Sequence, residues 1–376
     1  MNTCEQVRRF LEIDALPLWS TKGVWGNGCF VEYFSLAGVP QDPGFTRTRV
    51  QARQIYVFAH AQLMGFGEHS RLLEKSAAFF MKNCWLGSKR GWARRVTRFG
   101  QLIDDTPDLY DLSFALLALA WLYRSTLEKH YLVIAHQTLD FIESTLAHPY
   151  GGFFSFAGDS NYRQQNPHMH LAEAMIAWMD LAPDMRFLNL ANTIVGLLET
   201  RFYDRSTGAL GEFFTADWNP APGPEGQIVE PGHQLEWAWI LCHHRRLGGA
   251  AMQDTAARLI YFARKYGHDP STGLTVDQVT REGRILSSSH RLWPQTETLK
   301  GALAETEFIN PVKLSHIDQV VTALFERFLK PSPISGTWID HFNADGTIRT
   351  DRIPASSLYH ICLAFFELMR LESKLV

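Results

Sequence analysis

The chain has 376 residues, of which 46% are hydrophobic and 20% charged, so it carries enough apolar surface for a large folded core. Its 36 basic and 39 acidic residues give a net charge of -3 without any basic run, which argues against nucleic acid as a partner. The longest uncharged apolar stretch, residues 112–123, is shorter than the roughly 20 residues that cross a bilayer, so we expect no membrane contact either.

The start of the chain and its cysteines indicate the compartment. The first residues are charged and amphipathic and show no export signal. The five cysteines are scattered, odd in number and never in a C-x-x-C pair, which fits a reducing cytoplasm and disfavours a thiolate metal site. We expect one domain over residues 1–376, because closed toroids run long as single domains. A homodimer is compatible with the sequence.

Polar side chains recur near the start of apolar helical segments, at intervals of 57 to 65 residues. The side chains that follow this rhythm are Arg53, Tyr110, His170, His233, Gln295 and His360. A period near sixty indicates one helical unit repeated six times, because a helix pair buries its apolar face only when neighbouring pairs stack on it.

Two kinds of helix alternate along the chain. Apolar residues return every three or four positions, with one charged face, in residues 70–85, 131–146, 186–203, 256–267 and 318–329. The segments that carry the polar markers are apolar almost all round, as expected of helices packed on both sides. These inner segments are residues 53–66, 110–123, 170–182, 233–242 and 358–369.

Six loops rich in glycine and aromatic residues separate the helical segments, and several contain the turn dipeptides S-G, N-G or D-G. Proline stands at or near the expected start of four inner helices, so the polar markers should share one end of the ring. We therefore predict an all-α fold, an (α/α)6 toroid of twelve helices in six pairs with short hairpins in the connecting loops. A funnel-shaped pocket on its axis is typical of sugar-binding proteins.

Three histidines, His170, His233 and His360, should meet at the mouth of this pocket. Glu173 and Glu236 follow the first two by three residues, so each carboxylate should lie on the same helix face as its histidine and could orient the imidazole. The remaining histidines lack this register, and we interpret His168, His243, His244 and His136 as structural.

Several spaced motifs between Trp25 and Leu368 resemble those of the N-acylglucosamine 2-epimerase superfamily. The motifs are R-x-x-A-R-Q-x-Y-x-F (49–58), D-x-Y-D-x-S-F-A (108–115), N-P-H-M-H-L-A-E-A (166–174), P-G-H-Q-L-E-W-A-W (231–239), W-P-Q-T-E (293–297) and the late Y-H (359–360). The resemblance implies the same toroid and an enzyme without metal or cofactor that moves protons at C2 of a free reducing sugar through an enediol. Groups with pKa values near neutrality, such as imidazole, suit that task.

Carried over motif by motif, the resemblance implies roles for individual residues. His233 and His360 match the two acid/base histidines, and Arg53 would bind the sugar oxygen at C1 or C2 and stabilise the enediolate. His170 and Glu236 would assist ring opening or hold the open chain. The other implied substrate contacts are Tyr110 and Asn166 to hydroxyl groups, and Trp293 and Gln295 at the start of the fifth inner helix.

The branch within the superfamily is indicated by what stands at three positions. Disaccharide 2-epimerases usually show paired tryptophans where this chain has Leu292-Trp293, and another tryptophan where Leu358 stands. N-acylglucosamine epimerases typically continue the late F-H with Pro-Arg, whereas Ile361-Cys362 follows here. The pattern S-S-L-Y-H is most similar to monosaccharide isomerases that interconvert mannose-type and fructose-type sugars, which is the activity we expect.

Three alternatives stay open at this point. The first is an N-acylglucosamine 2-epimerase. The second is a glycoside hydrolase or lyase on the same toroid, using Asp104 or Asp105 with Glu236 or Glu297 as paired carboxylates. The third is a non-catalytic protein of the renin-binding type, against which the intact His233 and His360 argue.

Overall fold

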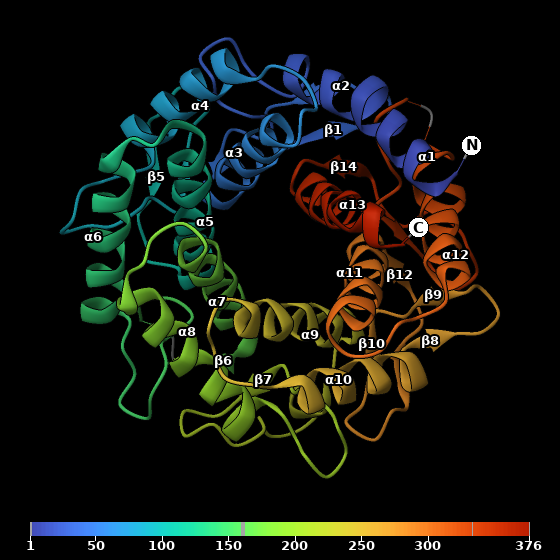
Figure 1. Ribbon diagram of the computed structural model, residues 1–376. Coiled ribbons are helices and arrows are strands. Elements are labelled where there is room, and N and C mark those ends of the chain that lie inside the picture. The colour runs from blue at the N-terminus through green and yellow to red at the C-terminus, as the bar shows by residue number, and fades with distance from the viewer. Residues whose placement is uncertain (1, 159–161, 333, 376) are drawn as a thin grey trace.

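Six helices line the inside of a ring and the others wrap its outside in this computed structural model, which describes residues 2–158, 162–332 and 334–375 (Figure 1). The inner helices are α3 (Thr48–Leu63), α5 (Leu109–Thr126), α7 (Gln165–Met179), α9 (Pro231–Arg246), α11 (Leu292–Phe308) and α13 (Ser356–Leu375). The outer helices are α4 (Ser70–Asn83), α6 (Lys129–Thr145), α8 (Met185–Leu197), α10 (Gln253–Tyr266), α12 (Leu314–Leu324) and an N-terminal run of α1 (Thr3–Arg9), the π-helical turn η1 (Phe10–Ala15) and α2 (Leu16–Thr21). The predicted (α/α)6 toroid is thus confirmed.

Burial explains why each helix lies where it does. The outer helix α4 buries one stripe, including Leu73, Ala77 and Phe80, and exposes its charged residues. The inner helix α5 is buried on almost every side from Leu109 to Leu122, because it packs on α3, α7 and α6. An amphipathic helix can only cover a core, whereas an all-round apolar helix must lie inside it.

The ring closes through contacts between the two ends of the chain. Each inner helix packs on the next, and α13 packs on α3. Strand β14 (Arg352–Pro354) pairs antiparallel with β1 (Tyr33–Ser35), which in turn pairs with β2 (Pro40–Gln41). The last loop is therefore fixed to the first one, and the polar ends of α13 and α3 become neighbours.

The connecting loops contain more strand pairing than hairpins alone. Local pairs join β4 (Arg95–Val96) to β5 (Leu102–Asp104), β8 (His268–Asp269) to β9 (Leu274–Thr275), and β10 (Gln278–Val279) to β11 (Ile285–Ser287). Other pairs link loops of successive repeats: β3 (Thr46–Arg47) to β4, β6 (Arg163–Gln164) to β7 (Phe213–Phe214), and β12 (His290–Arg291) to β13 (His341–Phe342). The predicted hairpins are present, and the links between repeats are an addition to the prediction.

These strands set the starting points of the inner helices. Strands β3, β6 and β12 each run directly into α3, α7 and α11. Asp108 caps α5 by accepting hydrogen bonds from the backbone of Tyr110 and Asp111. The amino ends of the inner helices consequently lie together at one mouth of the ring. No helix in the described part of the chain is long and apolar enough to cross a bilayer.

Candidate active site

A cavity of about 530 Å³ lies at this mouth, and most of the residues selected from the sequence line it. The predicted residues that contribute to its wall are Arg53, Tyr110, Asn166, His170, His233, Glu236, Trp293 and His360. They come from all six inner helices, which the sixty-residue period had placed in register. Its volume is within the range of about 300–1,000 Å³ usual for small-molecule sites.

Gln295 is the exception among the predicted substrate contacts. It is 3% exposed and does not line the cavity. Its side-chain oxygen accepts a hydrogen bond from the Thr275 backbone, and its amide nitrogen donates to the carbonyls of Thr275 and Arg291. The side chain therefore secures strand β9 to the start of α11, and the structure gives no support to the prediction that it contacts substrate.

His233 has a different carboxylate partner from the one we expected. Its Nδ1 donates to Glu212 Oε1 at 3.0 Å, and Glu230 Oε2 lies 3.6 Å away, whereas Glu236 points elsewhere. Burial alone would lower the pKa of His233, but the negative charge and hydrogen bond of Glu212, with Glu230 and Glu236, outweigh it and raise the pKa to about 9. His233 is therefore an imidazolium at neutral pH.

His360, in contrast to His233, is neutral. Its Nδ1 donates to Glu297 Oε1 at 2.9 Å, and the residue is buried. Burial lowers its pKa well below the usual value, and the positive charges of Arg53 and Lys300 lower it further. Because Glu297 only accepts hydrogen bonds when ionised, His360 keeps its proton on Nδ1 and its Nε2 lone pair stays available. Neutral His360 is suited to accept a proton.

Trp293 lies against both imidazoles. Its ring centroid is 4.8 Å from that of His233 and 5.8 Å from that of His360. The two histidines thus face one cavity beside a shared aromatic wall. An imidazolium and a neutral imidazole in one site form an acid and base pair whose pKa values have been pushed apart by their surroundings.

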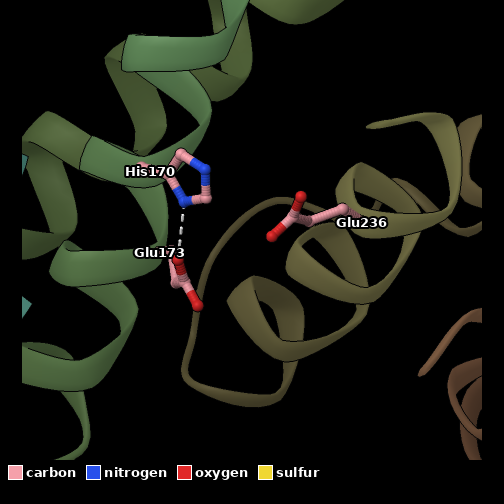
Figure 2. Close-up of side chains that lie close together, drawn as sticks. All are labelled: His170, Glu173 and Glu236. Carbon is pink, nitrogen blue, oxygen red and sulfur yellow. Dashed lines mark hydrogen bonds and ion pairs between the residues drawn. The ribbon is translucent and has the colours of Figure 1, made fainter. Parts of the chain in front are cut away.

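His170 and Glu173 form the pair that the three-residue spacing predicted. Nδ1 of His170 donates to Glu173 at 2.9 Å, and Tyr359 donates its hydroxyl to the other oxygen of the same carboxylate. Glu236 of α9 points towards this pair from across the cavity floor (Figure 2). Its two carboxylate oxygens are buried and make no hydrogen bond within the described residues. Burial and the neighbouring Glu297 raise the pKa of Glu236 to about 7, so its carboxyl group can accept or donate a hydrogen bond at the floor of the cavity.

A buried lysine ammonium group lies beneath the carboxylates at the floor of the cavity. Lys300 Nζ lies 2.7 Å from Glu297 Oε2 and 3.6 Å from Glu236 Oε1. Clusters of donor atoms that could surround a metal ion exist here, formed by His170, Glu173 and Glu236 and by Glu236, Glu297 and His360. The Lys300 ammonium group lies among these carboxylates and offsets part of their charge, so we interpret the cluster as an ion network.

Arg53 presents a guanidinium group without a carboxylate partner among the described residues. Nη2 donates to the Tyr110 hydroxyl at 2.6 Å, while Nε has no partner. The group lies over the rings of Phe114, Tyr359 and Tyr110, with distances to their centroids of 4.0, 5.1 and 5.5 Å. A buried cation held by aromatic faces is poised to bind an oxygen that becomes negative.

Sequence reasoning missed several residues of the wall and its support. Glu212 is a loop residue outside the helical register, so only its place in a glycine-rich loop could have drawn attention to it. Lys300 follows Glu297 by three residues, a spacing that usually marks an exposed ion pair. Asp340, which lines the cavity and accepts a hydrogen bond from Ser357, lies in a loop without a motif.

The paired carboxylates of the hydrolase hypothesis are not brought together. Asp104 lies near Arg94 and Asp105 pairs with Arg90 on the surface, and neither lines the cavity. Glu297 supports His360 from behind. A pair of acidic groups across a glycosidic bond, as hydrolysis needs, is thus not formed by these residues.

Comparisons with known proteins identify the family of the chain. The sequence model of the family described as N-acylglucosamine 2-epimerase matches residues 28–364. The chain is 36% identical to a mannose-6-phosphate isomerase of Rhizobium meliloti over 94% of this chain and 93% of that protein. It is 22% identical to a cellobiose 2-epimerase of Bacteroides fragilis over 92% and 93%. A solved structure of D-mannose isomerase superposes with a TM-score of 0.84 at 19% identity, covering 98% of this chain and 97% of the other. The chain therefore belongs to the N-acylglucosamine 2-epimerase family and is a sugar isomerase or epimerase.

Proposed function

We propose that the protein interconverts a free mannose-type aldose and the corresponding ketose through an enediol. The observation that carries this proposal is the pair of imidazoles on one cavity, each held through Nδ1 by its own carboxylate, His360 by Glu297 and His233 by Glu212. The surroundings lower the pKa of His360 and raise that of His233, which favours a neutral base and a protonated acid. Removing a proton next to an aldehyde needs a base at carbon and an acid at oxygen at the same time. The two histidines supply both at neutral pH.

In the forward direction Nε2 of His360 takes the proton from C2 of the open-chain sugar. The electron pair of the C2–H bond forms the C1–C2 double bond, and O1 accepts a proton from Nε2 of His233. The product of this step is a neutral enediol. Arg53 donates hydrogen bonds to O1 and O2 and stabilises the negative charge that develops on them in the transition state.

The second half returns each proton. His233, now neutral, takes the proton from the O2 hydroxyl, the C2 carbonyl forms, and the electrons of the double bond take the proton from His360 at C1. Both histidines are then back in their starting states, and the ketose leaves. Delivery of a proton to C2 from the opposite face would instead give the epimer, so the same groups could support N-acylglucosamine 2-epimerisation, the activity that gives the family its name.

Two features favour isomerisation of a monosaccharide. Leu292 and Leu358 are fully buried and do not line the cavity, so Trp293 is the one tryptophan that the described wall offers to a sugar ring. The names of two relatives, a mannose-6-phosphate isomerase and a D-mannose isomerase, point to the same type of reaction. A second sugar unit would find no further indole to stack on.

A free sugar is favoured over its phosphate ester by the charges at the cavity edge. Arg47 is paired with Glu32 at 2.8 Å, and Arg291 with Asp277 at 3.0 Å and with Glu230 at 3.2 Å. The carboxylates of these pairs offset the positive charge that a phosphate group would need. Phosphorylated mannose is the second candidate, because several arginines do line the cavity and the Rhizobium relative bears that name.

The substrate is tested by incubating the protein with mannose, mannose 6-phosphate, fructose, glucose and N-acetylmannosamine in deuterated water and following the products by NMR. We expect mannose and fructose to interconvert with deuterium entering at the exchanged carbon. The ratio kcat/KM for mannose should exceed that for its 6-phosphate at least about tenfold, or about 1.4 kcal/mol. Faster turnover of the phosphate, or epimerisation of N-acetylmannosamine alone, would contradict the proposal.

Glu212→Gln should move the alkaline limit of activity to lower pH. His233 acts as an acid only while protonated, so activity persists below its pKa of about 9 and falls as the pH rises through that value. The amide removes the charge of Glu212 and lowers the pKa of His233, and each lost unit costs about tenfold in rate on the alkaline side. The pH profile of kcat/KM measures this shift, and an unchanged alkaline limb would contradict the acid role of His233.

The same variant should change how stability depends on pH. The pKa of His233 is raised on folding from about 6.5, so its pairing stabilises the fold fully below pH 6.5. That contribution is lost as the pH rises through about 9. Melting temperatures measured at pH 6 and pH 9.5 should therefore differ more for the wild type than for Glu212→Gln.

The sequence also predicts a cytoplasmic location and is compatible with a homodimer. Both remain proposals. Fractionation of the source cells and the molar mass of the purified protein in solution test them directly.

A further inference from the structure

Lys300 is a fully buried cation that does not touch the cavity. It is 0% exposed, lies on α11 one turn after Glu297, and is absent from the cavity wall. Its Nζ lies 4.5 Å from the ring centroid of Trp239, so an aromatic face covers one side of the charge. It can neither reach a substrate nor form a Schiff base with one. A buried charge is costly unless paired, so its partners indicate its role.

The shortest ion pair of Lys300 is with Glu297, the carboxylate that holds the proposed base His360. Nζ lies 2.7 Å from Oε2 of Glu297, and Oε1 of the same carboxylate accepts the Nδ1 proton of His360 at 2.9 Å. Lysine, carboxylate and imidazole thus form a line from the core to the cavity. Glu236 Oε1, at 3.6 Å from Nζ, is a looser second partner.

We propose that Lys300 is a positioning residue that keeps Glu297 ionised, so that His360 holds its proton on Nδ1 and offers the Nε2 lone pair to the sugar. This role rests on the proposed function of His360 as the base. An ionised carboxylate can only accept a hydrogen bond, whereas a protonated one can donate. A protonated Glu297 would donate to Nδ1 and leave the imidazole proton on Nε2, where it blocks the base.

The surrounding charges explain why such a cation is needed. Burial raises the pKa of both Glu297 and Glu236, and the adjacent positive charge of Lys300 opposes this rise at Glu297 more than any other group does. A third carboxylate, Glu173, raises the pKa of both further. The charged and titratable groups that face this cluster are Arg53 on α3, His170 and Glu173 on α7, His233 and Glu236 on α9, and Tyr359 and His360 on α13. Without Lys300, three buried carboxylates would share one floor with no ammonium group beneath them.

The first experiment observes the tautomer without any substrate. The protein labelled with ¹⁵N in histidine is compared by NMR with Lys300→Met at pH 7, and the His360 signals are assigned with His360→Gln. We expect His360 to be protonated on Nδ1 in the wild type and to shift towards Nε2 protonation in Lys300→Met. Lys330→Met, which removes an exposed lysine from a pair with Glu326, is the matched control and should leave the signals unchanged. An unchanged tautomer in Lys300→Met would overturn the proposal.

The second experiment is kinetic. In Lys300→Met the acid limb of kcat/KM should move to higher pH, with much of the activity recovered on the alkaline side, because raising the pH ionises Glu297 again. Loss of the Lys300 charge also raises the pKa of His360 directly, so this shift supports the proposal only together with the change of tautomer. A lower plateau with an unmoved acid limb would mean that Lys300 only supports packing, and would overturn the proposal. If the wild type fails to exchange the C2 proton of any sugar, the proposed function falls, while the tautomer measurement still decides the role of Lys300.

A comparison in a background without a carboxylate at 297 covers the case in which Lys300→Met does not fold. Lys300→Met combined with Glu297→Leu removes one charge of each sign and keeps the interior balanced. A leucine at 297 offers Nδ1 of His360 no hydrogen bond, so the double variant and Glu297→Leu alone should show the same His360 tautomer. A tautomer shift on removing Lys300 in the leucine background would overturn the role through Glu297.

Discussion

Replacing His360 by alanine should lower the rate of C2 proton exchange by about 10²- to 10⁴-fold, the range that a general base usually contributes. His360 lies in the cavity wall with its Nε2 available and Glu297 behind it, so alanine removes the base without touching the ion pair of Glu297 and Lys300. Exchange of the C2 proton with deuterated water, followed by NMR, measures the effect. Exchange at the wild-type rate would rule out the assigned role.

His233→Ala should also lower the rate of C2 proton exchange, but the rate should depend on pH in a different way. Loss of the acid removes protonation of O1, so the variant should lose the alkaline limb that reflects the pKa of His233 near 9. The matched control is His136→Ala on the outer helix α6, where the imidazole pairs with Asp184 far from the wall. That variant should exchange like the wild type, and both active-site variants should keep the wild-type far-UV circular dichroism.

The toroid could be predicted because the apolar pattern of each helix is visible in its own sequence and recurs in every helix pair. Each inner helix needs apolar residues on all sides, and each outer helix needs one apolar stripe, so the alternation is visible in the sequence. The polar residues near the start of the inner helices interrupt that apolar pattern, and their spacing near sixty marks them as neighbours in space. Arg53, Tyr110 and His360 were found in this way, although they are far apart in the chain.

The partners of these residues could not be predicted, because partnership depends on how helices rotate and how loops fold back. Glu236 follows His233 by three residues, yet the carboxylate that holds His233 is Glu212, which the strand pair β6–β7 brings in from a loop. Gln295 stands at the position expected from the sixty-residue period, but its side chain faces β9 and not the cavity. For both residues the sequence predicted the place on the helix, whereas the contacts of the side chain depend on the direction in which it points.

The charges of the site follow a layered order that no single motif encodes. Lys300 lies deepest, carboxylates including Glu297 and Glu236 lie above it, and the histidines and Arg53 face the cavity. In the mechanism we propose, each layer sets the protonation of the next, since a carboxylate above a cation stays ionised and an imidazole on such a carboxylate keeps its proton on Nδ1. Catalysis at C2 would then depend on Lys300 and Glu297, which do not line the cavity.

Arg53→Met should lower kcat by about 10²- to 10³-fold, as expected when a donor to a developing oxyanion is lost. It should leave the free energy of unfolding within about 1 kcal/mol of the wild type. The guanidinium has no carboxylate partner among the described residues, so its removal leaves no buried anion behind, and the lost stacking on Phe114 is offset by the removal of a poorly solvated charge. Assays with mannose and urea unfolding measure the two quantities.

Arg49, one turn earlier on α3, provides the opposite case. It pairs with the buried Asp111 at 3.2 Å and also lies 3.9 Å from Asp108, but does not line the cavity. Arg49→Met leaves the buried Asp111 without its cation, whereas Asp108 keeps Arg94 at 3.1 Å. It should destabilise the fold by about 3 kcal/mol, while kcat of the folded fraction changes little. If Arg53→Met instead unfolded as readily as Arg49→Met and its folded fraction kept the wild-type kcat, Arg53 would be a structural cation and the enediolate would need another partner.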